Sequence, residues 1–196
     1  QEILAAKSGT FTTSVGEVPL ADDPNASPSF NPGFSPAFAG FSFGAYTHRN
    51  GMSQYGAKAR ADSGVNYKDI LSKYYPGKQI QEGYSEPGSI SVDGYGSVDF
   101  GQYLYGIAEM PSTWNKEALK AQAVAARSYA LAYTNNGAKS ICATQSCQVY
   151  IGHSKGGDWE QAVKDTKGVV VTDGGSATST QYSSPSGGYL NTSGWD

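Results

Sequence analysis

Residues 103–129, YLYGIAEMPSTWNKEALKAQAVAARSY, contain a lone acid followed by a long segment that is rich in alanine. Asn115 is a candidate helix N-cap, and the residues after it are good helix formers. The segment is apolar on more than one face, and a helix that is apolar nearly all round is buried. We therefore expect a buried central helix around which the rest of the domain packs.

The lone acid between the apolar residues and the start of the expected helix is Glu109. Its apolar neighbours, among them Leu104, Ile107 and Met110, would partly desolvate the carboxyl and raise its pKa, as a general acid requires. Pro111 disfavours helical backbone at the residue before it, so we expect Glu109 at the edge of a regular element, facing a cleft. The alternative is a solvated or salt-bridged acid, which is the commoner state of a surface glutamate.

Arg127 lies on the expected helix, eighteen residues after Glu109. A guanidinium on a buried helix keeps its proton and must find an anion or carbonyl partners. Two interpretations follow. Arg127 holds the substrate or the Glu109 carboxylate, or it ties the helix to a neighbouring loop.

The composition fits one domain with a sizeable core, at 196 residues and 38% hydrophobic content. With 25 glycines, 14 tyrosines and 16% charged residues, the chain favours turns, strands and irregular loops over a helical bundle. The net charge of −3 argues against nucleic acid as a partner. Because the sequence begins at Gln1 rather than Met, we expect an exported protein whose leader is not included, and the ending at Asp196 leaves room for a further strand or domain.

Cys142 and Cys147 lie five positions apart in a polar loop. A local disulfide is geometrically possible and would agree with export. Free thiols are a second possibility. Zinc is the third, but two thiolates make half a zinc site and the chain has only two histidines, His48 and His153.

The chain divides into an extended Phe/Pro/Ser-rich arm, residues 1–40, and a domain, residues 41–196. The arm is expected to lie across the domain surface or to reach a neighbouring chain, which would give self-association. In the domain, the sequence predicts strands at 41–46, 90–92, 97–100, 148–152 and 168–173 and helices at 51–63, 67–75 and 159–167 besides the central one. The expected fold class is α+β, a single cleft-containing domain in which mixed or antiparallel sheets pack around the central Ala-rich helix.

Three stretches, residues 48–77, 103–130 and 182–189, resemble the SpoIID/LytB family of bacterial cell-wall proteins. The resemblance implies a lytic transglycosylase that cuts the glycan strands of peptidoglycan between N-acetylmuramic acid and N-acetylglucosamine, without a cofactor. The glutamate of the family's Glu-Met-Pro motif is the catalytic acid, which is Glu109 here. The family's arginine matches Arg127, its histidine block matches residues 47–54, and its Ser-rich Gly-Gly segment matches residues 183–188.

The resemblance and side-chain polarity nominate further groups for substrate binding. They are Arg127, His48, Ser53, Gln54, Gln122, Ser183, Ser184, Gly187 and Gly188. A turn histidine bonded to backbone is the alternative for His48.

Two departures from the family pattern bear on these assignments. The histidine block precedes the Glu-Met-Pro segment, as in a circular permutation, which is tolerated when the termini are close in space. Ala45, Thr47, Arg49 and Asn50 stand where glycine is frequent, so this loop has less backbone freedom. Some relatives bind zinc near the cysteines, but Ser146 stands where a histidine would help, and no metal is expected.

Ordinary glycoside hydrolases need two carboxylates. A lytic transglycosylase can work with one, because the 6-hydroxyl of the sugar is the nucleophile. Asp99 is a candidate second carboxylate, although a surface or capping acid is the alternative. The rival functions are a wall-binding or amidase-stimulating module, since relatives are described as amidase enhancers, and a cell-surface assembly protein. The expected partners are peptidoglycan glycan strands and a cell-wall amidase, and the expected location is extracellular, in the cell envelope.

Overall fold

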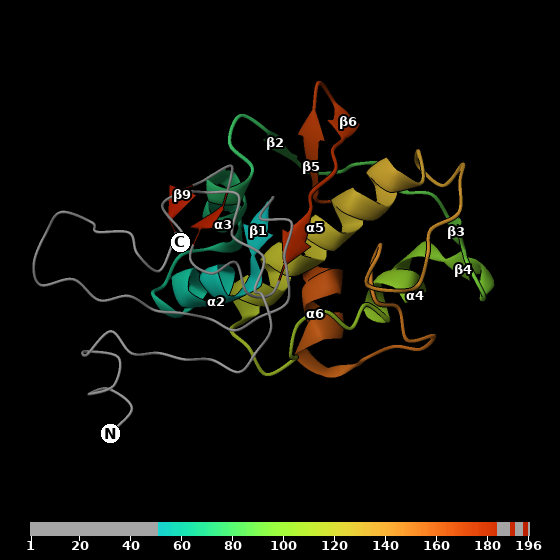
Figure 1. Cartoon of the computed structure of the whole chain (residues 1–196), viewed down its shortest axis with the longest axis horizontal. Coiled ribbons are helices and arrows are strands. Elements are labelled where there is room, and N and C mark those ends of the chain that lie inside the picture. Colours follow the sequence, from blue (N-terminus) through green and yellow to red (C-terminus); the bar gives the residue numbers. More distant parts are fainter. Residues whose placement is uncertain (1–50, 184–188, 191–193, 196) are drawn as a thin grey trace, which may run out of the picture. The chain divides into compact units, whose positions relative to one another are not determined.

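The computed structural model describes residues 51–183, 189–190 and 194–195 (Figure 1). The elements in chain order are β1 (Met52–Ser53), α2 (Gln54–Asp62), α3 (Tyr67–Tyr74), β2 (Gln79–Gln81), β3 (Ser89–Val92), β4 (Gly96–Asp99), α4 (Phe100–Tyr105), α5 (Lys116–Tyr133), α6 (Gly157–Asp165), β5 (Val170–Asp173), β6 (Ser176–Ala177), β7 (Tyr182–Ser183), β8 (Tyr189–Leu190) and β9 (Gly194–Trp195). The 1–40 arm, the strand expected at 41–46 and His48 lie outside the described residues.

Helix α5 is the centre of the domain, as predicted (Figure 1). Asn115 begins it, and the Asn115 Oδ1 accepts the Glu117 N–H at 3.0 Å. Twelve of the eighteen helical residues are buried, and half of these twelve are alanines. The helices α2, α3, α4 and α6 and the strand β5 all pack against α5. Small side chains let these neighbours approach closely, which is why an Ala-rich helix can be enclosed on so many sides.

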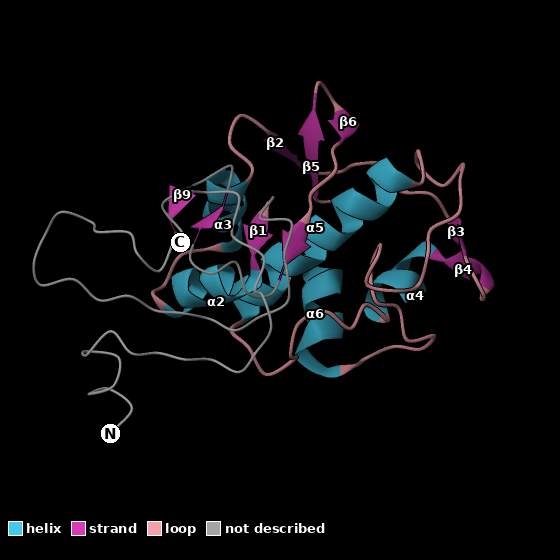
Figure 2. Ribbon diagram, viewed as in Figure 1, coloured by secondary structure: helices cyan, strands magenta, loops and turns pink. Residues whose placement is uncertain are grey.

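Short strands complete an α+β fold, which confirms the predicted class (Figure 2). β2, β5 and β6 form an antiparallel sheet, β3 and β4 form a hairpin, β8 pairs with β9, and β1 pairs with β7 in parallel. Val170 and Val171 of β5 are buried, and the Val171 N–H donates to Ser128 Oγ on α5 at 2.8 Å. This bond fixes the three-stranded sheet to the central helix.

The prediction of a strand at residues 148–152 is wrong. This segment forms a single bridge, between Tyr150 and Ile107. The Val149 N–H, which a continuing strand would use for pairing, donates instead to the Glu109 carboxylate. The segment is therefore held by a side chain of the candidate site. The helix expected at 159–167 begins earlier, at Gly157, and ends at Asp165.

None of the described helices is long and apolar enough to cross a membrane.

Candidate functional site

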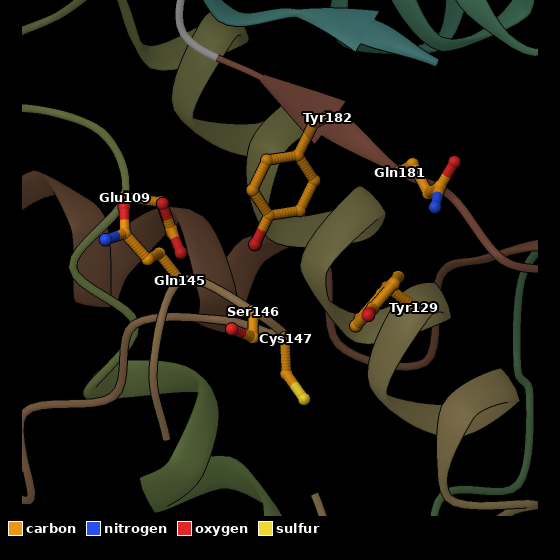
Figure 3. Close-up of a pocket in the computed structure, with 7 residues that line it drawn as sticks. All are labelled: Glu109, Tyr129, Gln145, Ser146, Cys147, Gln181 and Tyr182. Atoms are coloured by element: carbon orange, nitrogen blue, oxygen red, sulfur yellow. The ribbon is translucent and has the colours of Figure 1, made fainter. Parts of the chain in front are cut away.

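Glu109 lines a pocket of about 120 Å³ (Figure 3). The chain reaches this position after α4 ends at Tyr105, so Glu109 lies at the edge of a regular element as expected. The other lining residues are Tyr129, Gln145, Ser146, Cys147, Gln181 and Tyr182. Within this described lining, Glu109 is the one carboxylate.

The Glu109 carboxyl is half-buried, and burial raises its pKa above the usual range. Two weaker effects act in the opposite direction. The Val149 N–H donates to Glu109 Oε1 at 2.6 Å, and the positive charge of Lys155 lies nearby. Because burial is the largest of the three effects, the protonated form of Glu109 is favoured compared with a glutamate in water.

Lys155 is a site residue that the sequence analysis missed. Its ammonium donates to the Met110 carbonyl, and its Nζ lies 5.5 Å from the centre of the Trp159 ring. Burial lowers the Lys155 pKa, while the Glu109 charge raises it. The sequence around Lys155 contains no motif, and only the tertiary contact brings it to Glu109.

The sequence analysis assigned three segments to the site: residues 47–54, the Glu109 segment and residues 183–188. The described parts of these segments lie together. β1 pairs with β7 in parallel, so that Met52 lies opposite Tyr182. Gly51 precedes β1 with a φ of 77°, and a Cβ at this position would lie 1.9 Å from the Gln181 carbonyl oxygen. Glycine is therefore required where the two strands come together.

The residue after β1 then reaches the Glu109 segment. Gln54 Nε2 donates to the Glu109 carbonyl at 3.1 Å and to Gln122 Oε1 at 3.3 Å. Both glutamines are buried and neither lines the pocket. Their contacts place them behind Glu109, where they hold its backbone.

Two predicted substrate-binding serines are described. Ser53 Oγ accepts the Gly56 N–H at 3.0 Å and so caps α2, and the residue is 1% exposed. The Ser183 hydroxyl is buried and has no hydrogen-bond partner among the described residues. Ser184, Gly187 and Gly188 lie outside the described part of the chain.

Arg127 lies away from the pocket lining and is 1% exposed. Its guanidinium donates to the Val163 and Val169 carbonyls at 3.0 and 3.2 Å and to Thr166 Oγ1 at 3.2 Å. Its Nε lies 2.8 Å from Glu86 Oε1, an ion pair without the alignment of an N–H hydrogen bond. Burial lowers the Arg127 pKa to about 10, and Glu86 opposes this change. The contacts are those of the second interpretation, in which Arg127 ties α5 to its neighbours, and they favour it over substrate binding.

A buried polar network fixes Tyr182 at the pocket, and the sequence analysis did not identify its central residue, Gln148. Gln148 Nε2 donates to the Ala126 carbonyl at 3.0 Å and to the Tyr182 hydroxyl at 2.9 Å. Its Oε1 accepts from the Tyr103 hydroxyl at 2.8 Å. Burial raises the pKa of both tyrosines, so both stay protonated at neutral pH. Tyr182 opens the YSSPSGGY stretch, whereas nothing in the local sequence marks Gln148.

The cysteines form a disulfide between Cys142 and Cys147, with the two Cα atoms 5.6 Å apart. The closed loop carries Gln145, Ser146 and Cys147 to one wall of the pocket (Figure 3). Both sulfurs are used in this bond, so neither is a thiolate ligand. The disulfide thus supports the wall opposite the Tyr182 strand.

The two remaining candidates have surface positions. Asp99 Oδ1 accepts the Gln102 N–H at 2.9 Å and caps α4, so the capping alternative holds and Asp99 is not a second carboxylate of the pocket. His153 is exposed.

The fold and the site define an α+β protein in which a single glutamate, next to a Met-Pro turn, lines a small pocket beside a central alanine-rich helix. Residues 91–172 match the SpoIID family, described as stage II sporulation protein. The chain is also 44% identical over 85 residues to the amidase enhancer of Bacillus subtilis (strain 168), a match that covers 43% of this chain and 12% of the relative. Both matches support the assignment to the SpoIID/LytB family that the sequence motifs indicated.

The family match runs from β3 into β5 and therefore contains Glu109, α5 and the disulfide loop. It leaves out β1 and β7, which the tertiary structure brings to the same site. The match spans about an eighth of the length of the curated relative, which is a much longer protein.

Proposed function

We propose that this chain is a lytic transglycosylase that cleaves the bond between N-acetylmuramic acid and N-acetylglucosamine in peptidoglycan and leaves a 1,6-anhydro end. One observation carries the proposal. Glu109 is the one carboxylate in the described lining of the pocket, and burial raises its pKa. A site with one proton-exchanging acid fits a reaction in which the substrate supplies its own nucleophile.

The reaction uses Glu109 twice. The protonated carboxyl gives its proton to the glycosidic oxygen while the bond from that oxygen to C1 of N-acetylmuramic acid breaks. The 6-hydroxyl oxygen of the same sugar then bonds to C1, and the Glu109 carboxylate takes the hydroxyl proton. The raised pKa favours the acid form that begins the cycle, and the Val149 N–H and the Lys155 charge stabilise the carboxylate formed halfway.

A hydrolase that activates water would need a second carboxylate, about 5 to 9.5 Å from the first. The nearest candidate from the sequence, Asp99, serves as the cap of α4. The described pocket walls opposite Glu109 carry amide, hydroxyl and aromatic groups. These groups can orient a sugar and its 6-hydroxyl but cannot act as a base.

The test compares the wild type with Glu109→Gln, which keeps the size of the side chain and removes the exchangeable proton. Glu82→Gln is the matched control, because Glu82 is an exposed glutamate that pairs with Lys68 outside the pocket. Each protein is incubated with glycan strands, both intact and stripped of stem peptides, and the ends are identified by mass spectrometry. We expect 1,6-anhydro ends from the wild type and the control, and a rate lower by about 10² to 10⁴-fold for Glu109→Gln. Equal product from Glu109→Gln, or reducing ends in place of anhydro ends, would refute the mechanism.

A second candidate function is stimulation of a cell-wall amidase, which the name of the Bacillus subtilis relative supports. The same variants separate it from cleavage. Amidase activity on purified cell walls is measured with added wild type, Glu109→Gln or Glu82→Gln. Stimulation that persists in Glu109→Gln assigns the effect to binding, while stimulation lost only in Glu109→Gln makes it a consequence of glycan cleavage.

We further propose that the protein works outside the cytoplasm, at the cell wall. The disulfide supports this location, since disulfides persist in oxidising compartments. Self-association through residues 1–40 stays a prediction. Light scattering of the full chain and of a chain lacking these residues tests it, and an unchanged mass per particle would leave the assembly role without support.

A further inference from the structure

Two tyrosines on the last turns of α5 extend the site beyond the pocket. Tyr129 lines the pocket with Glu109, and Tyr133 follows one helical turn later. Their rings are stacked, with the centroids 5.7 Å apart and the planes at 26°. Tyr133 is 48% exposed and is one of three large apolar residues exposed to this degree in the described chain.

The position of the pair is better suited to a ligand than to the core. Tyr129 faces the pocket from α5, on the side opposite Glu109 (Figure 3). Burial raises the pKa of Tyr129, with a smaller contribution from Tyr133, so its hydroxyl stays a hydrogen-bond donor. The pair therefore continues the surface of the pocket outward along the helix, from a half-buried ring to an exposed one.

The chemistry of this surface matches a saccharide. One face of a pyranose ring carries C–H groups that pack against an aromatic ring, while its hydroxyl and N-acetyl groups need hydrogen-bonding partners. The rings of Tyr129 and Tyr133 offer the first kind of contact, and Gln145, Ser146 and Gln181 of the pocket offer the second. Binding sites commonly combine aromatic walls with a few placed polar groups in this way. The separation of the ring centroids is also close to the length of one sugar ring in an extended glycan.

We propose that Tyr129 and Tyr133 form a saccharide subsite, in which Tyr133 holds the sugar ring that follows the disaccharide bound across Glu109. This proposal rests on the proposed function for the identity of the glycan. Beyond the proposed function, the subsite means that the site binds more of the glycan strand than one disaccharide, and that binding of the longer strand depends on Tyr133.

The experiment measures glycan binding in the full-length chain that carries Glu109→Gln, which prevents turnover. Peptidoglycan-derived oligosaccharides of two, four and six sugars are titrated by calorimetry. The variants are Tyr133→Ala, Tyr133→Phe and Tyr95→Ala. Tyr95 is the matched control, since it is 49% exposed, packs on another tyrosine at 4.9 Å and does not line the pocket.

We expect Tyr133→Ala to weaken binding of the four- and six-sugar ligands by about 3- to 10-fold, the size of one aromatic contact, and to leave the disaccharide unchanged. Tyr133→Phe and Tyr95→Ala should bind like the parent. Equal affinity of Tyr133→Ala and the parent at every length would overturn the subsite, and so would an equal loss in Tyr133→Ala and Tyr95→Ala.

The outcome is separable from that of the proposed function. Length-dependent binding through Tyr133, with no 1,6-anhydro ends from the wild type, would keep the subsite and reject the cleavage. Anhydro ends from the wild type, with binding that Tyr133→Ala does not change, would keep the cleavage and reject the subsite. A parent that binds none of the three oligosaccharides would reject the subsite.

Discussion

Replacing Arg127 with methionine tests whether this arginine holds the fold or the substrate. The guanidinium is 1% exposed, donates to two carbonyls and one hydroxyl, and pairs with Glu86. Methionine fills part of the space but leaves these acceptors and the Glu86 carboxylate without a partner. Breaking a buried charge pair from one side costs about 3 to 5 kcal/mol. At about 2 to 4 °C per kcal/mol for a domain of this size, the melting temperature should fall by about 6 to 20 °C.

Urea unfolding followed by circular dichroism measures the free energy of unfolding directly. Arg127→Lys should lose less, because one ammonium keeps the charge but cannot serve three acceptors in a fixed fork. Lys164→Met is the matched control, since Lys164 pairs with Glu160 on the exposed side of α6 and should lose under about 1 kcal/mol.

The pairing with Glu86 gives a second check. Adding Glu86→Gln to Arg127→Met should recover part of the lost stability, because it removes the unpaired carboxylate, and the two substitutions should be non-additive. The reasoning fails if Arg127→Met unfolds within about 1 kcal/mol of the wild type, which is the range of an ordinary surface substitution. A variant of that stability that cannot cleave glycan would restore the substrate-binding interpretation.

Three further predictions concern the pocket and its supports. Burial raises the folded pKa of Glu109 above its unfolded value near 4.5, so ionisation of Glu109 destabilises the folded state as pH rises. Thermal unfolding should therefore show Glu109→Gln more stable than the wild type at pH 7, with the difference in stability lost below pH 4.5. A difference in stability that does not change with pH would contradict this prediction. Gly51→Ala should lower stability by more than Gly64→Ala in the same measurement. Both glycines have a positive φ, which costs alanine about 1 to 2 kcal/mol. Only at Gly51 would the added Cβ also collide with the backbone at Gln181, next to β7. The double variant Cys142→Ser, Cys147→Ser should lose about 2 kcal/mol in urea unfolding through a more flexible unfolded chain, and reductant should lower wild-type stability by a similar amount but leave this variant unchanged.

The local sequence was sufficient for the central helix and for the position of Glu109. The alanine-rich stretch with an N-cap asparagine specifies α5 because helix propensity and capping act within a few residues. The apolar residues before Glu109 and the proline after its neighbour likewise place the acid at the edge of an element. The strand expected at 148–152 failed because a tertiary contact, from Glu109 to Val149, took the hydrogen bond that the strand would have used.

Polarity was a poor guide to which side chains face the pocket. Ser53, Gln54 and Arg127 are polar residues in family-like motifs, yet each makes its hydrogen bonds to other groups inside the protein. A buried polar group must find a partner, and which partner it finds depends on the packing of segments far apart in the chain. Lys155 and Gln148 became part of the site for the same reason, without any local signal.

By itself the sequence determined the fold class, the central helix, the acid at its approach and the spacing that allows the disulfide, because all of these depend on neighbouring residues. The tertiary structure decided the rest. The parallel pairing of β1 with β7 brings two ends of the domain to Glu109, and burial at that junction raises the pKa of its carboxyl. The environment of a proton donor is a property of the whole packed domain, since it depends on every group that excludes water from it.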